Sequence, residues 1–247
     1  MGNNFIITLD IDWAPDWMIE YVANILIEKG VKATWFITHA SPAIEVIQQR
    51  SDIFESGIHP NCMPGSTHGS NEDEVLRHVK KLVPDAISMR THGLYQSTRF
   101  LAKAAVDHGI SVDVSLFLPK TSNLVEHRLN WQDARLWRIP YFWEDDIEMF
   151  EDDPIWAMSD PRLQVPGLKV FDFHPTYLCL NTDTFNVYEK LKKEKPLPTW
   201  DLDFVRPHIG DGPGPKTMFL ELVDHLASST GGRWIKELIP NKTAKRD

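Results

Sequence analysis

The chain has 247 residues, of which 42% are hydrophobic and 25% charged, as is ordinary for a globular protein. Its formal net charge of -9 argues against a nucleic-acid partner, because phosphate backbones are bound by clustered Lys and Arg. No apolar stretch reaches the roughly 18 residues that a membrane-spanning helix needs. The length suits one large domain over residues 1–247, and α/β barrels often have this size.

The start of the chain lacks the basic segment that opens a signal peptide and leads directly into an apolar run. The two cysteines, Cys62 and Cys179, in a chain without an export signal favour a reducing compartment. We therefore expect a cytoplasmic protein.

Strands and helices alternate through the first half of the sequence. Apolar runs predict the strands, and Pro or a capping pattern at the start with Gly at the end predicts the helices. The expected order is strand 5–12, helix 15–29, strand 32–38, helix 42–49, strand 55–59, helix 70–83, strand 86–89, helix 97–108 and strand 112–114. This repetition predicts an α/β protein with a largely parallel sheet or barrel.

The second half is less regular. We expect strands at 136–139 and 168–173 and helices at 182–193 and 216–229. The Pro- and Gly-rich stretch 196–215 is predicted to be a functional lid, with a disordered segment as the alternative. The polar residues 242–247 predict a frayed end.

The first apolar run ends in two carboxylates two residues apart, Asp10 and Asp12. Alternate residues of a strand face the same side, so both point to one spot if the strand continues through Asp12. Because two unpartnered carboxylates are costly to bury, this spot is expected to hold a metal ion, a base or both. The plainer alternative is that Asp12 caps the helix that follows.

Polar residues gather at the ends of four predicted strands. The clusters are Asp10 with Asp12, residues 57–68, residues 89–93 and residues 171–175. Side chains at the C-terminal ends of barrel strands converge on the active site. One carboxylate and two imidazoles suit a divalent transition metal, while a second carboxylate and a further histidine can act as base and acid. Such a set would hydrolyse an amide or an ester.

The pattern resembles the polysaccharide deacetylase family, the NodB-homology enzymes of carbohydrate esterase family 4, in the branch whose first motif is Asp-x-Asp. The motifs Gly57-Ile58-His59-Pro60 and Arg90-Thr91-His92-Gly93 stand in the right order, and the resemblance covers roughly residues 5–180. It implies a distorted (β/α)7-type barrel. It also implies removal of N- or O-acyl groups from sugars with a divalent metal, Zn²⁺ first, or Co, Ni, Mn or Fe.

Residue by residue, the resemblance implies a role for five side chains. Asp10 matches the catalytic base, Asp12 and His59 match metal ligands, Arg90 matches the residue that orients the base, and His174 matches the acid for the leaving nitrogen.

The second and third motifs depart from the family pattern. The family places two histidines four residues apart, but the residue four after His59 is Met63. His68, nine residues after His59 in a loop, is the expected third metal ligand, with a surface histidine as the alternative. His92 stands where the family often has an apolar residue or proline, and we expect it to contact substrate.

The fourth motif has a weaker counterpart. Tyr141 and Trp143 would supply an aromatic wall at the substrate, and Asp145 or Asp146 the carboxylate beside the late histidine.

We therefore predict a metal-dependent hydrolase that removes an N-acyl group, first of all N-acetyl, from a sugar. For a chain inside the cell, a nucleotide- or lipid-linked precursor of a surface polysaccharide is favoured over a finished polymer. The alternatives are formamide removal or cyclic-amide opening at the same metal site, and a carbohydrate-binding homologue without turnover. An unrelated metal-dependent barrel hydrolase would normally carry His-x-His after the first strand, which is absent here. The sequence leaves the oligomeric state open.

Overall fold

The computed structural model describes residues 4–239, in which nine strands form one mixed sheet. The order across the sheet is β6-β7-β5-β4-β3-β2-β1-β9-β8. The strands are β1 (Asn4–Asp10), β2 (Ala33–Ile37), β3 (Phe54–Ile58), β4 (Ser88–Met89), β5 (Val112–Phe117), β6 (His127–Trp131), β7 (Ala134–Tyr141), β8 (Trp143–Glu144) and β9 (Leu168–Phe173). All neighbours pair in parallel except β6 and β7, which form an antiparallel hairpin. The predicted parallel α/β sheet is confirmed.

The sheet curves back on itself through the stretch that joins β7 to β8. Strand β7 pairs with β5, and one residue later β8 pairs with β9. Between them, the Phe142 N–H donates to the Val170 carbonyl at 2.8 Å, and the Phe142 carbonyl accepts from the Lys120 N–H at 3.1 Å. One continuous segment therefore joins the two sides of the sheet. Counting β7 with β8, the described residues supply the seven parallel strand positions of the predicted (β/α)7-type arrangement.

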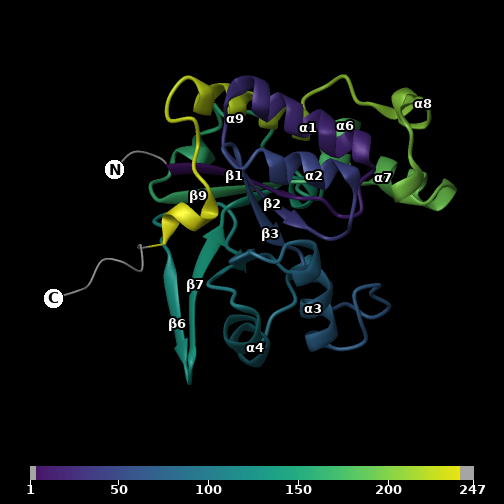
Figure 1. Ribbon diagram of the computed structural model, residues 1–247. Helices are drawn as coiled ribbons and strands as arrows, with labels where there is room; N and C mark the ends of the chain where they lie inside the picture. Colours follow the sequence, from purple (N-terminus) through teal and green to yellow (C-terminus); the bar gives the residue numbers. More distant parts are fainter. Residues whose placement is uncertain (1–3, 240–247) are drawn as a thin grey trace.

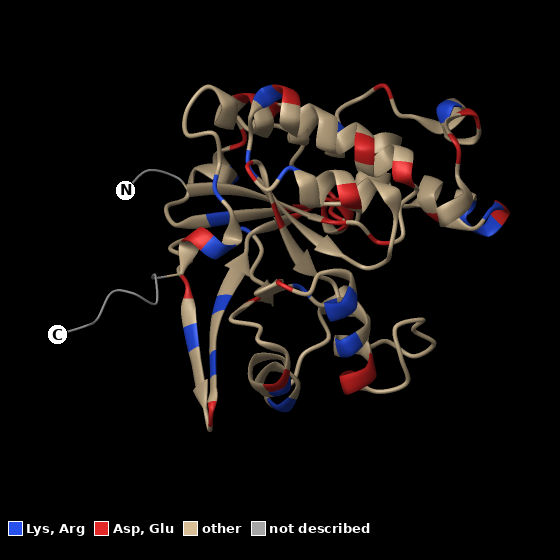
Figure 2. Ribbon diagram, in the orientation of Figure 1, with Lys and Arg blue, Asp and Glu red and all other residues tan. Residues whose placement is uncertain are grey.

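Helices pack on both sides of the sheet (Figure 1). One group, in the upper part of the figure, consists of α1 (Asp16–Lys29), α2 (Pro42–Gln49), α6 (Pro175–Leu180) and α9 (Pro215–Ala227). The lower part holds α3 (Glu72–Leu82) and α4 (Thr98–His108), and the β6–β7 hairpin projects there as an arm. Three further helices complete the set, α5 (Asp145–Glu148), α7 (Asn186–Glu194) and α8 (Leu202–Val205). Charged side chains of both signs lie along the outer helices, while the strands are mostly uncharged (Figure 2).

Local sequence signals set the ends of the helices. Side chains of Ser41, Asn71 and Ser97 accept backbone N–H groups at the starts of α2, α3 and α4. Helix α1 ends at Gly30, which takes a left-handed φ of 64° that a residue with a Cβ adopts only at a cost.

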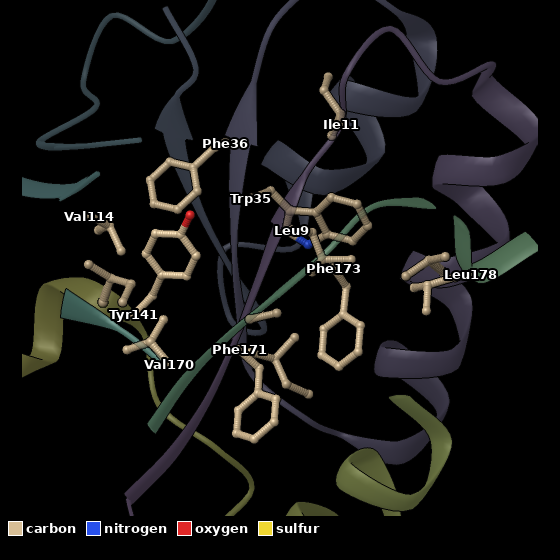
Figure 3. Close-up of a cluster of buried hydrophobic side chains, with 14 of the residues drawn as sticks. Leu9, Ile11, Trp35, Phe36, Val114, Tyr141, Val170, Phe171, Phe173 and Leu178 are labelled. Carbon is tan, nitrogen blue, oxygen red and sulfur yellow. The ribbon is translucent and has the colours of Figure 1, made fainter. Parts of the chain in front are cut away.

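The core has two parts, divided by the alternation of side chains along the strands. Phe36, Val114, Tyr141 and Val170 gather on one side of β1, inside the curve of the sheet (Figure 3). On the other side lie Leu9, Trp35, Phe173 and Leu178, beneath the helices. The adjacent residues Trp35 and Phe36 thus serve opposite parts of the core, as the two-residue period of a strand requires.

The second half differs from the prediction in its short elements. Strands β6 and β8 and helices α5 and α6 were not predicted, because each is short or lacks a clear period. The stretch 196–215 is ordered into short helical turns, and Asn181 holds it by donating to the carbonyls of Gly210 and Gly212 at 2.9 and 3.1 Å. The predicted frayed end at 242–247 lies outside the described residues. None of the helices within residues 4–239 combines the length and apolar character needed to cross a membrane.

A buried carboxylate fastens the C-terminal segment beneath the strands. Glu55 is 4% exposed and accepts hydrogen bonds from the Thr34 hydroxyl at 2.8 Å, the Ser88 hydroxyl at 2.9 Å and the Lys236 N–H at 3.0 Å. These partners lie on β2, on β4 and after α9, so one side chain joins three distant segments.

We expect Glu55→Ala to lower the free energy of unfolding by about 3 kcal/mol or more, because three buried donors lose their acceptor. Glu55→Gln retains an acceptor oxygen and should cost less. The exposed Glu20→Ala on α1 is the control and should change stability by less than about 0.5 kcal/mol. Urea unfolding measures all three, and a Glu55→Ala protein as stable as the control would contradict the assigned role.

Candidate active site

The predicted site residues lie at the C-terminal ends of neighbouring parallel strands. Asp10 ends β1, His59 follows β3, Arg90 follows β4 and His174 follows β9. Parallel strands present these ends at one rim, which is why residues far apart in sequence meet there.

Strand β1 does not continue through Asp12, so the prediction that Asp10 and Asp12 share a strand face is wrong. The strand ends at Asp10, and Asp12 and Trp13 take left-handed φ values of 37° and 57°. The Ala14 N–H closes this turn on the Ile11 carbonyl at 2.7 Å. The turn still brings both carboxylates to His59, whose Nδ1 lies 3.4 Å from Asp10 Oδ2 and whose Nε2 lies 3.2 Å from Asp12 Oδ1. Helix α1 begins after Pro15 without a side-chain cap, so Asp12 is not its cap.

Asp12, His59 and His92 form a group suited to a metal ion. Asp12 Oδ1 lies 3.2 Å from His59 Nε2 and 3.2 Å from His92 Nδ1. Two ligand atoms about 2.0–2.1 Å from a tetrahedral ion are about 3.3 Å apart, so these spacings fit a shared cation. Burial raises the pKa of Asp12, but the hydrogen bonds and charges of the two histidines outweigh it and bring that pKa well below its usual value. The carboxylate is thus ionised, as a ligand must be.

His68 lies outside this group. Its Nδ1 accepts the Asn61 N–H at 3.1 Å, and its ring stacks on His78 with centroids 4.9 Å apart. Burial, then the charges of His78 and His59, lower the pKa of His68 to about 4, so its ring is neutral and Nε2 carries the proton.

The expected base is held by a buried guanidinium. Arg90 is 1% exposed, and its Nη1 donates to Asp10 Oδ1 at 3.0 Å and also to Asp172 Oδ1. Its Nη2 donates to Thr8 Oγ1 at 2.8 Å, and its planar group lies over the rings of Phe36 and Tyr141, 4.8 and 4.6 Å from their centroids. Burial raises the pKa of Asp172 well above its usual value, so the charge of Arg90 is left mainly to Asp10.

The expected acid has a carboxylate partner of its own. His174 Nδ1 lies 2.7 Å from Asp145 Oδ1, and the His174 N–H donates to Asp145 Oδ2 at 2.8 Å. Burial lowers the pKa of His174, but Asp145 and the neighbouring Asp172 and Asp146 raise it, and the net pKa is well above the usual value. His174 Nε2 faces the other way, 3.6 Å from Asp12 Oδ2. A protonated imidazole thus lies beside the Asp12 carboxylate of the group suited to a metal ion.

The aromatic residues expected at the substrate are buried. Trp143 is fully buried and packs against Trp156, Phe171 and Phe173, so it lies in the core rather than at an open surface. Tyr141 is buried beneath Arg90 and donates from its hydroxyl to Glu144 Oε2 at 2.8 Å.

Sequence reasoning missed Asp172, Thr8 and Glu144. Thr8 precedes Asp10 by two residues, and Asp172 precedes His174 by two, each in a buried strand. Alternate residues of a strand face the same side, which was the reason for pairing Asp10 with Asp12. The same rule places Thr8 on the face of Asp10, inside the barrel. Burial, then the charge of Asp146, raises the pKa of Glu144 to about 8.

Comparison with known proteins identifies the family. A family model described as WbmS-like polysaccharide deacetylase matches residues 7–192. The chain belongs to this polysaccharide deacetylase family. A Bordetella bronchiseptica structure, described as a candidate polysaccharide deacetylase involved in O-antigen biosynthesis, is 30% identical with a TM-score of 0.77, and the match covers 90% of each chain. The deacetylase is thus a hydrolase by family.

A more distant structure shares the fold. A 4-alpha-glucanotransferase from Thermococcus litoralis is 12% identical, with a TM-score of 0.51 over 96% of this chain and 38% of that one. An acetyl xylan esterase of family 4 from Clostridium thermocellum, in complex with a cobalt ion, is 14% identical, with a TM-score of 0.46 over 96% and 90%. No curated protein matches the chain.

Arg90→Met should lower the free energy of unfolding by about 3–5 kcal/mol, because two buried carboxylates lose their shared cation. The double variant Arg90→Met/Asp172→Asn should recover part of the loss. Urea unfolding with EDTA present removes any contribution from bound metal.

The control is Arg162→Met, which removes the partly exposed ion pair with Asp160 and should cost about 1 kcal/mol or less. If Arg90→Met were no more destabilising than this control, the contacts of the guanidinium with Asp10 and Asp172 would not stabilise the folded protein as proposed.

Proposed function

We propose that this polysaccharide deacetylase is a metal-dependent hydrolase that removes an N-acyl group, most simply N-acetyl, from a sugar of a surface glycan. One observation carries the proposal. The donor group of Asp12, His59 and His92 has the buried base Asp10 on one side and the protonated His174 on the other. Base, cation site and acid are the three parts that amide hydrolysis by water requires.

The donor set fits a divalent cation, with Zn²⁺ as first choice and Co, Ni, Mn or Fe as alternatives. Two imidazole nitrogens and one carboxylate oxygen are typical of catalytic sites for these ions. We assign the third ligand to His92 rather than His68. His92 Nδ1 lies at ligand spacing from Asp12, 3.2 Å from its Oδ1, whereas His68 turns its Nδ1 to the Asn61 N–H. When bound, such a cation polarises the acyl carbonyl and lowers the pKa of its water toward ~7.

The chain's own residues move the protons. Asp10, oriented by the hydrogen bond from Arg90, accepts a proton from the attacking water as the new carbon–oxygen bond forms. His174 then donates its Nε2 proton to the departing nitrogen as the carbon–nitrogen bond breaks, which releases the acid and the free amine. Asp145 fixes the ring of His174 through Nδ1, so that Nε2 faces the site.

The description of the Bordetella bronchiseptica relative supports a glycan substrate, since it names a role in O-antigen biosynthesis. A panel of N-acetylated, N-formylated and cyclic-amide substrates would distinguish deacetylation from the other amide hydrolyses that the same groups could perform.

Asp10→Asn should retain bound metal but lose at least about 100-fold in turnover, because the amide cannot accept the proton. Asp12→Asn is the matched variant and should lose both metal and turnover. Elemental analysis of the purified proteins and an acetate-release assay provide the two readouts. Near-wild-type hydrolysis by Asp10→Asn would show that another group is the base.

His92→Ala should weaken metal binding by more than about 100-fold, whereas His68→Ala should weaken it less than about tenfold. Competition titration of Zn²⁺ against a chromophoric chelator measures both without any substrate. The reverse order of effects would return the third ligand to His68.

A further inference from the structure

An aromatic surface begins beside the expected acid and extends outward from the site. The ring of Tyr177, three residues after His174, meets the His174 ring edge-on with centroids 5.1 Å apart. Phe185 lies 5.9 Å from Tyr177, and Phe150 lies 4.9 Å from Phe185. Two intervening rings thus connect the acid to Phe150.

Phe150 is the most exposed of the large hydrophobic side chains in the described part of the chain. It is 65% exposed, while Phe185 is partly exposed and Tyr177 is buried. The exposed ring is fixed near the site, because it follows α5, whose first residue Asp145 binds His174. The Phe150 N–H also donates to the Ile147 carbonyl at 3.0 Å.

From this arrangement, and resting on the proposed function, we infer that Phe150 and Phe185 form a stacking subsite for a second sugar unit of the glycan whose reacting unit lies at His174. Sugar rings present apolar C–H faces, which pack on the electron-rich faces of aromatic rings. The row of rings begins at His174, which is proposed to protonate the leaving nitrogen. The neighbouring sugar unit therefore lies on the side of that nitrogen.

The charges next to Phe150 favour an uncharged occupant. Exposed acidic residues adjoin both rings in sequence, Glu151 and Asp152 after Phe150 and Asp183 before Phe185. The nearby cation Lys120 is paired with Glu148 at 3.0 Å and with Glu151 at 3.4 Å. A diphosphate would be repelled here, whereas a neutral sugar would not. The subsite therefore favours a glycan chain over a nucleotide-linked sugar, which is one of the two kinds of precursor, nucleotide- or lipid-linked, that the sequence alone suggested.

The test compares substrates of increasing length. The probes are N-acetylglucosamine, its β-1,4-linked tetramer and the uridine-diphosphate-linked monosaccharide. Phe150→Ala should lower kcat/KM for the tetramer by about three- to tenfold, mainly through KM, and leave the monosaccharide within about twofold. Phe150→Trp should retain the preference for the tetramer. An equal effect on all three probes, or none on the tetramer, would overturn the subsite.

The control is Trp131→Ala, a partly exposed aromatic residue of β6 on the projecting hairpin (Figure 1), which should change none of these values. Because the identity of the sugar could defeat the activity assay, tetramer binding to the zinc-loaded proteins is measured separately by calorimetry. If no probe is hydrolysed but the tetramer binds wild type more tightly than Phe150→Ala, the subsite stands and the proposed function fails. Binding that is equal in both proteins, or undetectable in both, would overturn the subsite.

Discussion

The site depends on one buried cation, the guanidinium of Arg90. It follows β4 and reaches across the interior to Asp10 on β1 and Asp172 on β9, so its ion pairs join strands that are not neighbours. A charge buried this deeply is stable only with such partners. Because burial raises the pKa of Asp172 well above its usual value, the positive charge of Arg90 is paired mainly with Asp10. The contacts that stabilise the interior of the sheet therefore also position the expected base.

The chemistry is divided among strands by the same topology. The base, the acid and the donor residues come from the ends of four strands, β1, β3, β4 and β9, and a parallel sheet brings these ends to one rim. The family pattern expects two histidines on one helix, whereas here the loop after His59 turns its next histidine, His68, toward Asn61 and His78. His92, from the loop after β4, lies at ligand spacing instead. A metal site requires donor atoms at the right separation, and any segment of the chain can supply them.

The proposed substrate side of the site is formed by the segment that carries the expected fourth-motif carboxylate and by the chain after α6. The short helix α5 contributes Asp145 to the acid and is followed by Phe150, and the chain after α6 adds Phe185. The acid and the proposed sugar-stacking surface are thus fixed by the same short segment. A glycan chain that extends from His174 across these rings would meet aromatic faces and acidic residues, which together suit uncharged sugar units.

The sequence by itself determined the alternating strands and helices, the parallel sheet and the motif residues at the strand ends, because two- and 3.6-residue periods and helix caps are local signals. It could not place Asp12, since a left-handed turn replaces the expected strand there. It could not choose between His68 and His92 as ligand, or recognise Asp172 and Phe150 as neighbours of the site. Those assignments depend on distances between segments that are far apart in the sequence, 80 residues in the case of Asp12 and His92, and only the tertiary structure sets such distances.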